Sequence, residues 1–337
     1  MDQVRATIRD VARRAGVSEA TVSRALRNLR HVAPGTAEDV RRAADELGFV
    51  PSRDAASLAT GRARIVSVVT PSLVSWFYAS VLDGVDEALR AQGYAVGLIH
   101  LGGAEERRRL SERELRASQA AAHVVIGFAL DDAEQALLRS IAVPVVTVGG
   151  RVDGIPGIGI PEEGAARMAV EHLASLGHRR IGHVGAGREE GLNPAVSVAR
   201  QDAWAAALAA AGAEQRPEWF GSGAFQLEAS RDAAERILAL RDRPTAIFAA
   251  SDISAFGVLV AAQRLGLRVP EDLSVAGIDD HPFAAGFGLT TVRQSPSEQG
   301  ARAVQLLMHR LGIRRSPVRE EPAPIELVVR TSTAPPA

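Results

Sequence analysis

Three short stretches in the first fifty residues carry apolar side chains at helical spacing. In residues 7–16 the apolar positions fall on one helical face, and Thr7 can cap this helix while Asp10 reaches back to it. Gly16 supplies a permissive residue for a tight turn, and Ser18 can cap a second helix directly after it. The pattern predicts two short helices that meet at a turn.

A third amphipathic stretch begins near Pro34, a good first-turn residue, and ends at Gly48, a typical residue just past a helix end. Three helices in about fifty residues make a small bundle. Residues 51–61 are then rich in alanine and serine, with Leu58 as their one large apolar side chain, which indicates a linker.

Beyond Arg64 the pattern changes to short β-branched runs that alternate with amphipathic helices, such as those over residues 195–211 and 254–265. Because the alternation stops and restarts once, it predicts two parallel α/β units. The predicted strands lie near residues 65–70, 94–100, 123–128, 145–148, 180–184, 245–249 and 273–278.

Length and composition agree with several folded domains. The 337 residues exceed the size at which a single hydrophobic core stops growing, and 46% hydrophobic with 23% charged residues is typical of a globular protein. Cysteine is absent, which excludes disulfides, thiolate zinc sites and cysteine nucleophiles.

Neither a membrane span nor an export signal is expected. The longest uncharged stretch, residues 65–82, contains Pro71 and four serines, and the first five residues lack the apolar run of a signal peptide. We therefore expect a cytoplasmic protein with no membrane partner.

Charge is distributed unevenly along the chain. Residues 1–64 contain 12 arginines and 8 acidic residues, a balance of +4, while the remaining residues contain 27 against 32. Lysine is absent, so cationic contacts to phosphate would have to use the guanidinium fork of arginine. The simplest interpretation of such an excess is a solvated basic face, so it is weak evidence for nucleic acid when taken alone.

The most informative motif is GVSEATVSR at residues 16–24. A capped second helix with small or polar residues on its first exposed turn, and Arg24 one turn later, suits insertion into a DNA major groove. The alternative is an ordinary helical hairpin, which the basic excess and the third helix disfavour.

Signatures along most of the chain resemble the lac repressor (LacI/GalR) family of bacterial transcription regulators. They comprise residues 7–24, Val32, residues 46–48 and 58–61, ASLGHRRI at 174–181, AASD at 249–252, residues 266–280 and LTTVRQ at 289–294. The resemblance implies a homodimeric DNA-binding regulator, expected to be a repressor, whose operator affinity changes when a small effector binds between two lobes. It implies no enzymatic activity, and it leaves open whether the effector releases or recruits DNA binding.

The implied fold class is α/β, with a small all-α helix-turn-helix headpiece before a two-lobed, periplasmic-binding-protein-like body of parallel sheets. The expected parts are a headpiece over 1–50, a hinge helix or linker over 51–63 and a body over 64–337, its N-lobe about 64–161 and 293–320 and its C-lobe about 162–292 and 321–332.

The resemblance also implies DNA-contacting residues. Glu19 departs from the family, because a carboxylate can accept from a cytosine amino group but repels phosphates. In the hinge, Leu58 would wedge into the minor groove beside small Ala55, although it could instead simply cover the surface of the body. Glu19, Ala20 and Arg24 are implied at base edges, and Thr7, Ser18, Thr21 and Ser23 at phosphates.

For the effector the resemblance implies seven cleft residues. The charged pair Arg200 and Asp279 can grip hydroxyl groups, and Trp204 offers either a flat face for a sugar ring or a purely structural core side chain. Ser75 and Ser251 replace asparagines of sugar-binding members, and a carbohydrate remains the favoured effector. The implied set is Ser75, Phe77, Arg200, Trp204, Ser251, Asp252 and Asp279.

No cofactor and no metal site is expected. The glycines of residues 185–191 have the wrong spacing for a dinucleotide loop, and His172, His178 and His183 lack the i, i+4 spacing of a helical metal pair, so solvated or capping histidines fit better. Catalytic triads and carboxylate pairs do not stand out. The rival classes are a solute-binding protein, which needs export, and a nucleotide-dependent enzyme, which lacks a fingerprint.

Overall fold

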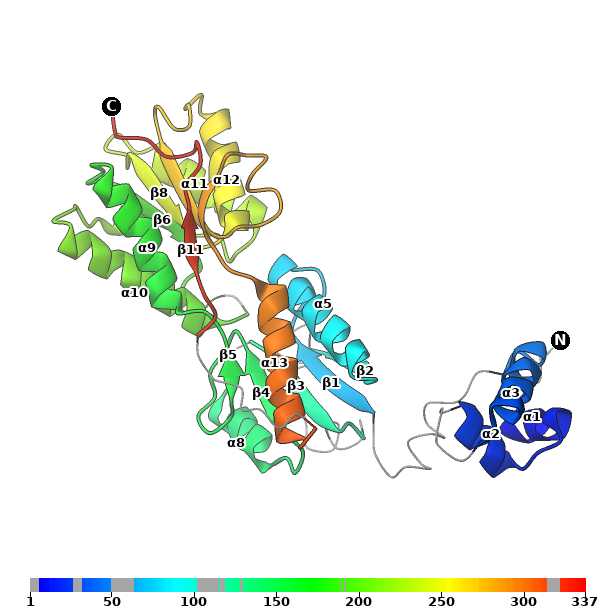
Figure 1. The fold of residues 1–337 in the computed structure, drawn as a ribbon. Coiled ribbons are helices and arrows are strands. Elements are labelled where there is room, and N and C mark those ends of the chain that lie inside the picture. Colours follow the sequence, from blue (N-terminus) through cyan, green and yellow to red (C-terminus); the bar gives the residue numbers. More distant parts are fainter. Residues whose placement is uncertain are drawn as a thin grey trace. The chain divides into compact units, whose positions relative to one another are not determined.

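The computed structural model describes residues 6–26, 32–49, 64–101, 115, 119–127, 130–188, 190, 192–313 and 322–337. The chain divides into two units, Met1–Arg64 and Ile65–Ala337, which are called the headpiece and the body below. Figure 1 traces both units along the sequence. Among the described helices, none is long and apolar enough to cross a bilayer.

The described residues of the headpiece form three helices, α1 (Ile8–Ala15), α2 (Glu19–Leu26) and α3 (Pro34–Glu46). The capping box predicted for α1 is present, because Thr7 accepts from the backbone of Asp10 and the Asp10 side chain accepts in return. Gly16 ends α1 with a φ of 68°, a left-handed conformation that glycine adopts without steric cost. Val11, Val22 and Val40, one from each helix, are fully buried and join the three helices.

The first lobe of the body, the N-lobe, is a five-stranded parallel sheet in the order β2-β1-β3-β4-β5. Its strands are β1 (Ile65–Thr70), β2 (Ala95–His100), β3 (Ala122–Ile126), β4 (Val145–Val148) and β5 (Gly157–Ile158), and its helices are α5 (Trp76–Ala91), α8 (Asp132–Ser140) and α13 (Pro296–Arg310).

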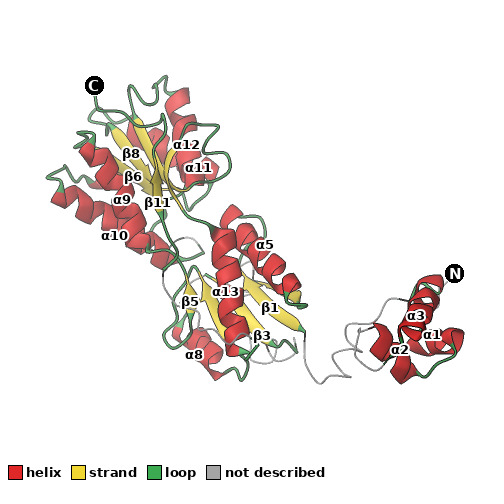
Figure 2. Ribbon diagram, viewed as in Figure 1, coloured by secondary structure: helices red, strands yellow, loops and turns green. Residues whose placement is uncertain are grey.

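Helices α5 and α13 lie side by side on one face of this sheet, and α8 covers the other (Figure 2). Successive residues of a strand point to opposite faces, so Val68 packs under α5 and α13 while Val69 packs with Leu138 of α8. Gly84 and Gly300 allow α5 and α13 to touch, since a Cβ at either position would come within 2.0–2.3 Å of a backbone oxygen of the other helix.

The second lobe, the C-lobe, has a six-stranded sheet in the order β11-β10-β9-β8-β6-β7, in which β11 alone is antiparallel. Its core places α9 and α10 on one face and α11 and α12 on the other. The elements are α9 (Glu162–Ser175), β6 (Ile181–Gly185), α10 (Pro194–Ala210), η1 (Pro217–Trp219), β7 (Phe220–Ser222), α11 (Leu227–Leu238), β8 (Ala246–Ala249), α12 (Asp252–Arg264), β9 (Ser274–Asp279), β10 (Thr290–Arg293) and β11 (Glu326–Val328).

The chain passes between the lobes three times, after β5, after β10 and before β11 (Figure 1). The predicted fold class, a helical headpiece followed by two parallel α/β lobes, is therefore confirmed. These crossings bring together residues that are distant in the sequence. The polar side chains around Arg200 lie beside the crossings.

Candidate functional site

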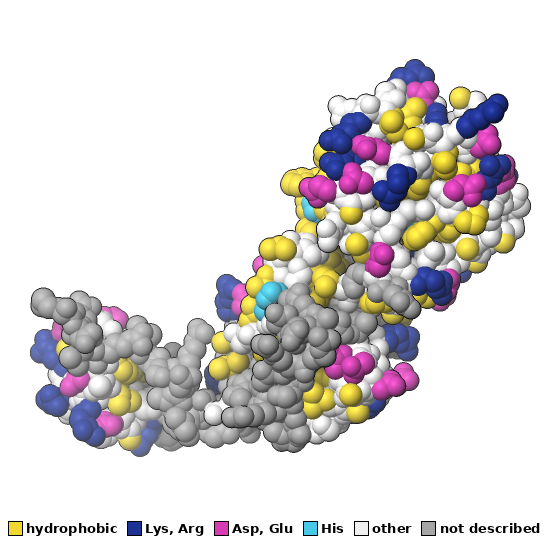
Figure 3. Space-filling model, turned by 180° about the vertical axis from the view of Figure 1, so that it is seen from behind, with side chains coloured by type: hydrophobic (Ala, Val, Ile, Leu, Met, Phe, Trp, Pro, Cys, Tyr) yellow, Lys and Arg dark blue, Asp and Glu magenta, His cyan; other side chains and the backbone are white. Residues whose placement is uncertain are grey.

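Helix α2 presents a polar surface to solvent while its apolar side packs on the headpiece core. Glu19, Ala20 and Arg24 are exposed, whereas Val22 and Ala25 are buried. The first two turns of α2 thus offer side chains that can hydrogen-bond to base edges. Figure 3 shows further arginine side chains on the surface of the headpiece.

The side-chain hydroxyl groups that we expect at DNA phosphates also form hydrogen bonds within the first turns of α1 and α2. Ser18 Oγ accepts from the N–H of Thr21 at 3.2 Å and lies 2.9 Å from the Thr21 hydroxyl, so it caps α2 as predicted. The Thr7 hydroxyl donates to Asp10 at 2.6 Å. Ser23 is half-buried on the following turn. These contacts fix two helix N-termini, whose free N–H groups favour anions.

Glu19 has a cationic partner in the structure. Arg9 Nε of α1 donates to Glu19 Oε1 at 3.1 Å, and both side chains are at least half exposed. A neighbouring positive charge reduces the repulsion that a carboxylate would feel beside DNA phosphates. The hinge residues Ala55 and Leu58 lie outside the described residues.

Arg200 is the centre of the polar network between the lobes. It projects from α10 with only 5% of its surface exposed, and its Nε and Nη2 both donate to Glu162 Oε2, at 2.8 and 2.6 Å. Its Nη1 donates to the backbone carbonyl of Ala250, which follows β8. Glu162, the first residue of α9, was not among the sequence-predicted residues.

Asp279 ends β9 close to this arginine, with a φ of 136° that is unusual for a residue with a side chain. Its Oδ1 accepts from Gln294 Nε2 at 2.7 Å, and Gln294 in turn accepts from Gln299 at 2.9 Å. Burial raises the pKa of Asp279 to about 6, against the opposing effect of the positive charge of Arg200.

Asp252 is completely buried and forms hydrogen bonds with the turn after β9. Its Oδ1 accepts from the Thr291 hydroxyl at 2.6 Å, and its Oδ2 accepts from the backbone N–H of His281 at 2.8 Å. Burial, and then the negative charge of Asp279, raise the pKa of Asp252 to about 7. Asp252 therefore holds the turn that carries Asp279, while the neighbouring Ser251 caps α12 by accepting from a backbone N–H at 3.1 Å.

Trp204 packs in the hydrophobic core of the C-lobe. Its ring is 7% exposed in the core of the C-lobe, and its Nε1 donates to the Ile181 carbonyl at 3.2 Å. Because its one polar atom is satisfied by the backbone of β6, the geometry corresponds to the structural alternative for this side chain.

Two of the three histidines considered above are buried, so the prediction of solvated or capping side chains is wrong for them. His178 bonds to Thr245 and to the Ala334 carbonyl, both at 2.9 Å. His183 stacks on Phe248 with ring centroids 4.8 Å apart, and burial lowers its pKa to about 4. For His183, a place on β6, between β8 and β7, overrides the polarity of the imidazole.

The start of α5 contributes the last two predicted residues. Ser75 precedes the helix without capping it through its side chain, and Phe77 packs against Gly149 at the end of β4. Gly149 has a φ of 71°, and a Cβ there would lie 2.9 Å from Phe77 Cζ. Phe77 is therefore close to the carboxyl end of the N-lobe sheet, half-buried.

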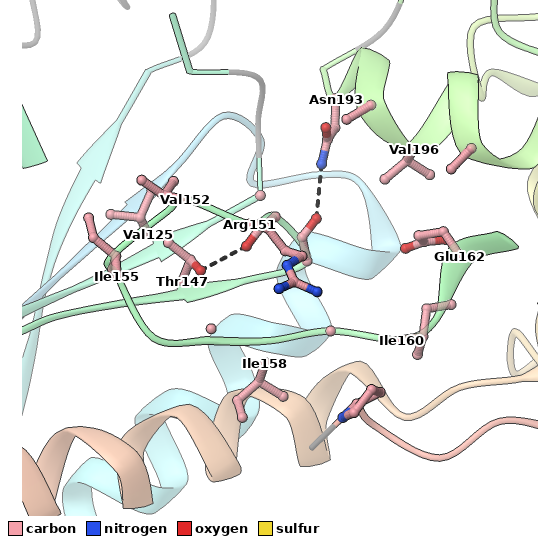
Figure 4. Close-up of a pocket in the computed structure, with 18 of the residues that line it drawn as sticks. Val125, Thr147, Arg151, Val152, Ile155, Ile158, Ile160, Glu162, Asn193 and Val196 are labelled. Carbon is pink, nitrogen blue, oxygen red and sulfur yellow. Dashed lines mark hydrogen bonds between the residues drawn. The ribbon is translucent and has the colours of Figure 1, made fainter. Parts of the chain in front are cut away.

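A cavity of about 1020 Å³ opens where the end of β4, the crossing segment and the first turn of α10 meet (Figure 4). Asn193 Nδ2 donates to the Gly149 carbonyl at 2.9 Å, and Thr147 donates to the Gly150 carbonyl at 2.7 Å. Glu162 lines this cavity, whereas the seven sequence-predicted effector residues do not. Glu162 connects the cavity to the predicted set through its ion pair with Arg200.

Comparisons with known proteins cover both units. Residues 7–52 match the family described as bacterial regulatory proteins, lacI family, and residues 170–333 match a periplasmic binding protein-like domain. The chain is 33% identical over 333 residues to the HTH-type transcriptional repressor PurR of Vibrio vulnificus (strain CMCP6), which covers 96% of this chain and 98% of that protein. The PurR repressor of Mannheimia succiniciproducens is 32% identical over 336 residues, 97% and 98% of the two chains.

Solved structures give the same result. The lac repressor dimer bound to operator and the anti-inducer ONPF superposes with a TM-score of 0.84 at 27% identity, over 98% of this chain and 99% of that one. The complex of the transcriptional regulator CelR with cellobiose gives a TM-score of 0.70 at 31% identity, over 97% and 100%.

Proposed function

Because the chain belongs to the LacI family of bacterial regulatory proteins, we propose that a small effector bound at the junction of the two lobes changes its affinity for operator DNA. Like the relatives that it matches over nearly the full length, the chain is a DNA-binding transcriptional regulator and not an enzyme. The observation that carries the effector proposal is the buried network of Arg200, Glu162, Asp279 and Gln294 beside the crossings between the lobes. A ligand that rearranges this network would shift the balance between lobe arrangements.

For DNA we propose that Arg24, Glu19 and Ala20 read base edges. Their exposure on α2 supports this assignment, and the capped N-termini of α1 and α2, with Thr7, Ser18, Thr21 and Ser23, suit contacts to phosphates. Leu58 and Ala55 remain proposed minor-groove contacts on the strength of the sequence resemblance. We also propose that the protein represses transcription as a homodimer in the bacterial cytoplasm, as the dimeric lac repressor complex with operator suggests.

For the effector we propose a carbohydrate or a carbohydrate derivative. If a ligand rearranges the network, the charged pair Arg200 and Asp279 would offer it donors and acceptors for hydroxyl groups, and a relative of 31% identity is described in complex with cellobiose. Phe77, which stays half-buried at the start of α5, is a better candidate than Trp204 for stacking on a sugar ring. Ser75, Ser251 and Asp252 would line the site or hold its backbone in position.

The test begins with selection of a binding duplex from a random-sequence DNA pool by the full-length protein. Affinity for the selected duplex is then measured over a range of salt concentrations, with and without members of a sugar and nucleoside library. We expect at least one sugar to stabilise the protein and to change operator affinity, commonly by about 5- to 150-fold. A nucleoside that does so while all sugars fail would overturn the carbohydrate assignment, and a ligand that binds without changing operator affinity would overturn the coupling.

A further inference from the structure

Each nitrogen of the Arg200 guanidinium is already bound by the protein. Nε and Nη2 share Oε2 of Glu162, and Nη1 donates to the Ala250 carbonyl. A buried arginine is the usual residue for holding a carboxylate or a phosphate through paired N–H groups. In this chain a side chain of the protein fills that position, from the first turn of α9.

Acidic groups outnumber the cation in this network. Glu162 pairs with Arg200, Asp279 lies beside this arginine, and Asp252 lies beside Asp279, with both aspartates more than nine-tenths buried. The raised pKa values of Asp252, about 7, and Asp279, about 6, show that burial makes further negative charge unfavourable here. An acidic ligand would add further negative charge beside a cation that is already paired.

One acceptor of Glu162 is left without a partner among the described residues. Both donors that reach Glu162 bind its Oε2, so no N–H or O–H of the described residues is directed at Oε1. Nearby, the side-chain oxygens of Gln299, which bonds to Gln294, and of Ser197, one turn before Arg200 on α10, are buried without a partner in the described part of the chain. Of these groups Glu162 lines the cavity, so a ligand there with a hydrogen-bond donor would complete the contacts of its carboxylate.

Glu162 is the member of the ion pair that a ligand meets. It lines the cavity at the lobe junction, as Figure 4 shows, whereas Arg200 lies behind it. Three arginines, Arg151, Arg167 and Arg310, also line the cavity, but all three are exposed to solvent, where screening weakens their attraction for an anion.

We propose that Glu162 is a specificity-determining residue of the effector site, whose carboxylate fills the anion position on Arg200 and thereby selects neutral or cationic ligands rich in hydroxyl or amino groups over acidic ones. This inference rests on the proposed effector site and specifies the chemistry of its ligand. Glu162 Oε1 accepts from the ligand, and Arg200 keeps Glu162 in place.

The first experiment tests whether Glu162 occupies an anion position, and it needs no effector. Thermal unfolding of the full-length Glu162→Ala variant is followed in sodium acetate and in sodium chloride of equal ionic strength. We expect the variant to unfold roughly 5 to 10 °C below the unmodified protein, because a buried arginine loses its partner, and acetate to recover part of this loss. The matched control is Glu171→Ala on the same helix, whose ion pair with Arg167 at 3.8 Å is exposed. If acetate raises the melting temperature of Glu162→Ala no more than that of Glu171→Ala, the proposal is wrong.

The second experiment tests selectivity with glucose, glucosamine, glucose 6-phosphate and glucuronate, each against salt of the same ionic strength. The two acids should not stabilise the unmodified protein, and they should bind Glu162→Gln at least about tenfold more tightly, because glutamine leaves the arginine charge unpaired. Equal stabilisation of the unmodified protein by an acid and a neutral sugar would overturn the selectivity. If no sugar stabilises any variant, the carbohydrate assignment of the proposed function fails, while the acetate experiment still decides the role of Glu162.

Discussion

The side-chain amide of Asn193 donates to the backbone carbonyl of Gly149 across 2.9 Å, and it thereby joins the first turn of α10 in the C-lobe to the end of β4 in the N-lobe. Both residues line the cavity beside Glu162 (Figure 4). A single neutral hydrogen bond stabilises by only about 0.5–1.5 kcal/mol, which suits a contact that would break if an effector changed the arrangement of the lobes as proposed.

The first prediction concerns this contact. Asn193→Ala should loosen the junction, so amide hydrogen exchange at residues 149–150 and 193–197 should accelerate by about three- to tenfold while the sheets stay protected. Hydrogen exchange with mass spectrometry measures this directly. The control is Gln215→Ala, which removes a comparable amide-to-carbonyl bond, to Ala205 at 2.7 Å, inside the C-lobe alone. Unchanged exchange at residue 149 in Asn193→Ala would show that the bond does not restrain the lobes.

The second prediction concerns the buried carboxyl group of Asp252. Its pKa rises from the usual 3.8 to about 7 on folding, so between these values the folded protein binds a proton that the unfolded chain has released. Stability should therefore decrease as the pH rises from about 4 to 7, by at most about 1.4 kcal/mol per pH unit for this one group. Asp252→Asn cannot ionise, and its melting temperature should fall less between pH 5 and pH 8 than that of the unmodified protein.

The control for this experiment is Asp272→Asn. The hydrogen bonds from Arg268 lower the pKa of Asp272 to about 2, so this carboxyl is ionised in both the folded and the unfolded states from pH 5 to 8. Its replacement should change the melting temperature by the same amount at both pH values. If Asp252→Asn behaves in the same way, Asp252 does not carry the proton in the folded protein.

Local features of this fold were predictable because they depend on neighbouring residues. Thr7 and Asp10 form their reciprocal cap three residues apart, and Gly16 takes the left-handed conformation that ends α1. The seven predicted strands all occur within two residues of the expected ends, since β-branched runs between helices are a strong signal. Short strands such as β5 and β7, of two and three residues, lack enough sequence to show any period.

The site was less predictable, because its contacts join distant segments. Glu162 follows Pro161 at the start of a helix, where an acidic residue usually just complements the helix dipole, and its partner Arg200 is 38 residues away. Gln294 ends one of the family signatures, so that signature could have identified it as a partner of Asp279. Helical periodicity placed Trp204 equally well in a core or a cleft, and its contact with the Ile181 carbonyl, distant in the sequence, favours the core.

The third prediction concerns DNA specificity. Arg24→Ala should weaken binding to the selected operator by roughly 5- to 150-fold more than binding to a scrambled duplex, because a bidentate arginine contact to guanine contributes about 1–3 kcal/mol of discrimination. Competition titration measures both affinities. The control is Arg42→Ala, since Arg42 is exposed on α3 and pairs with Asp39. An equal loss of affinity for both duplexes would reassign Arg24 to a phosphate contact.

The fourth prediction concerns the ion pair between Arg9 and Glu19 in the headpiece. If Glu19 accepts from a cytosine amino group, Glu19→Gln should relax the preference at one base pair in each half-site while raising affinity for non-specific DNA, because a charge that repels phosphates is removed. Arg9 lies 3.1 Å from this carboxylate, so Arg9→Ala should lower affinity for both kinds of duplex without changing which base is preferred. Binding of the single and double variants to duplexes substituted at every half-site position forms a double-mutant cycle.

The expected coupling in that cycle is small, about 0.2–1 kcal/mol, since both side chains are largely solvated. The shift in base preference, in contrast, should appear only in variants that change Glu19. If Arg9→Ala alters the preferred base as strongly as Glu19→Gln does, Arg9 positions the carboxylate on its base, and the pair reads DNA as one unit. If neither substitution alters the preference, Glu19 serves only to hold α2 against α1, and base reading falls to Ala20 and Arg24.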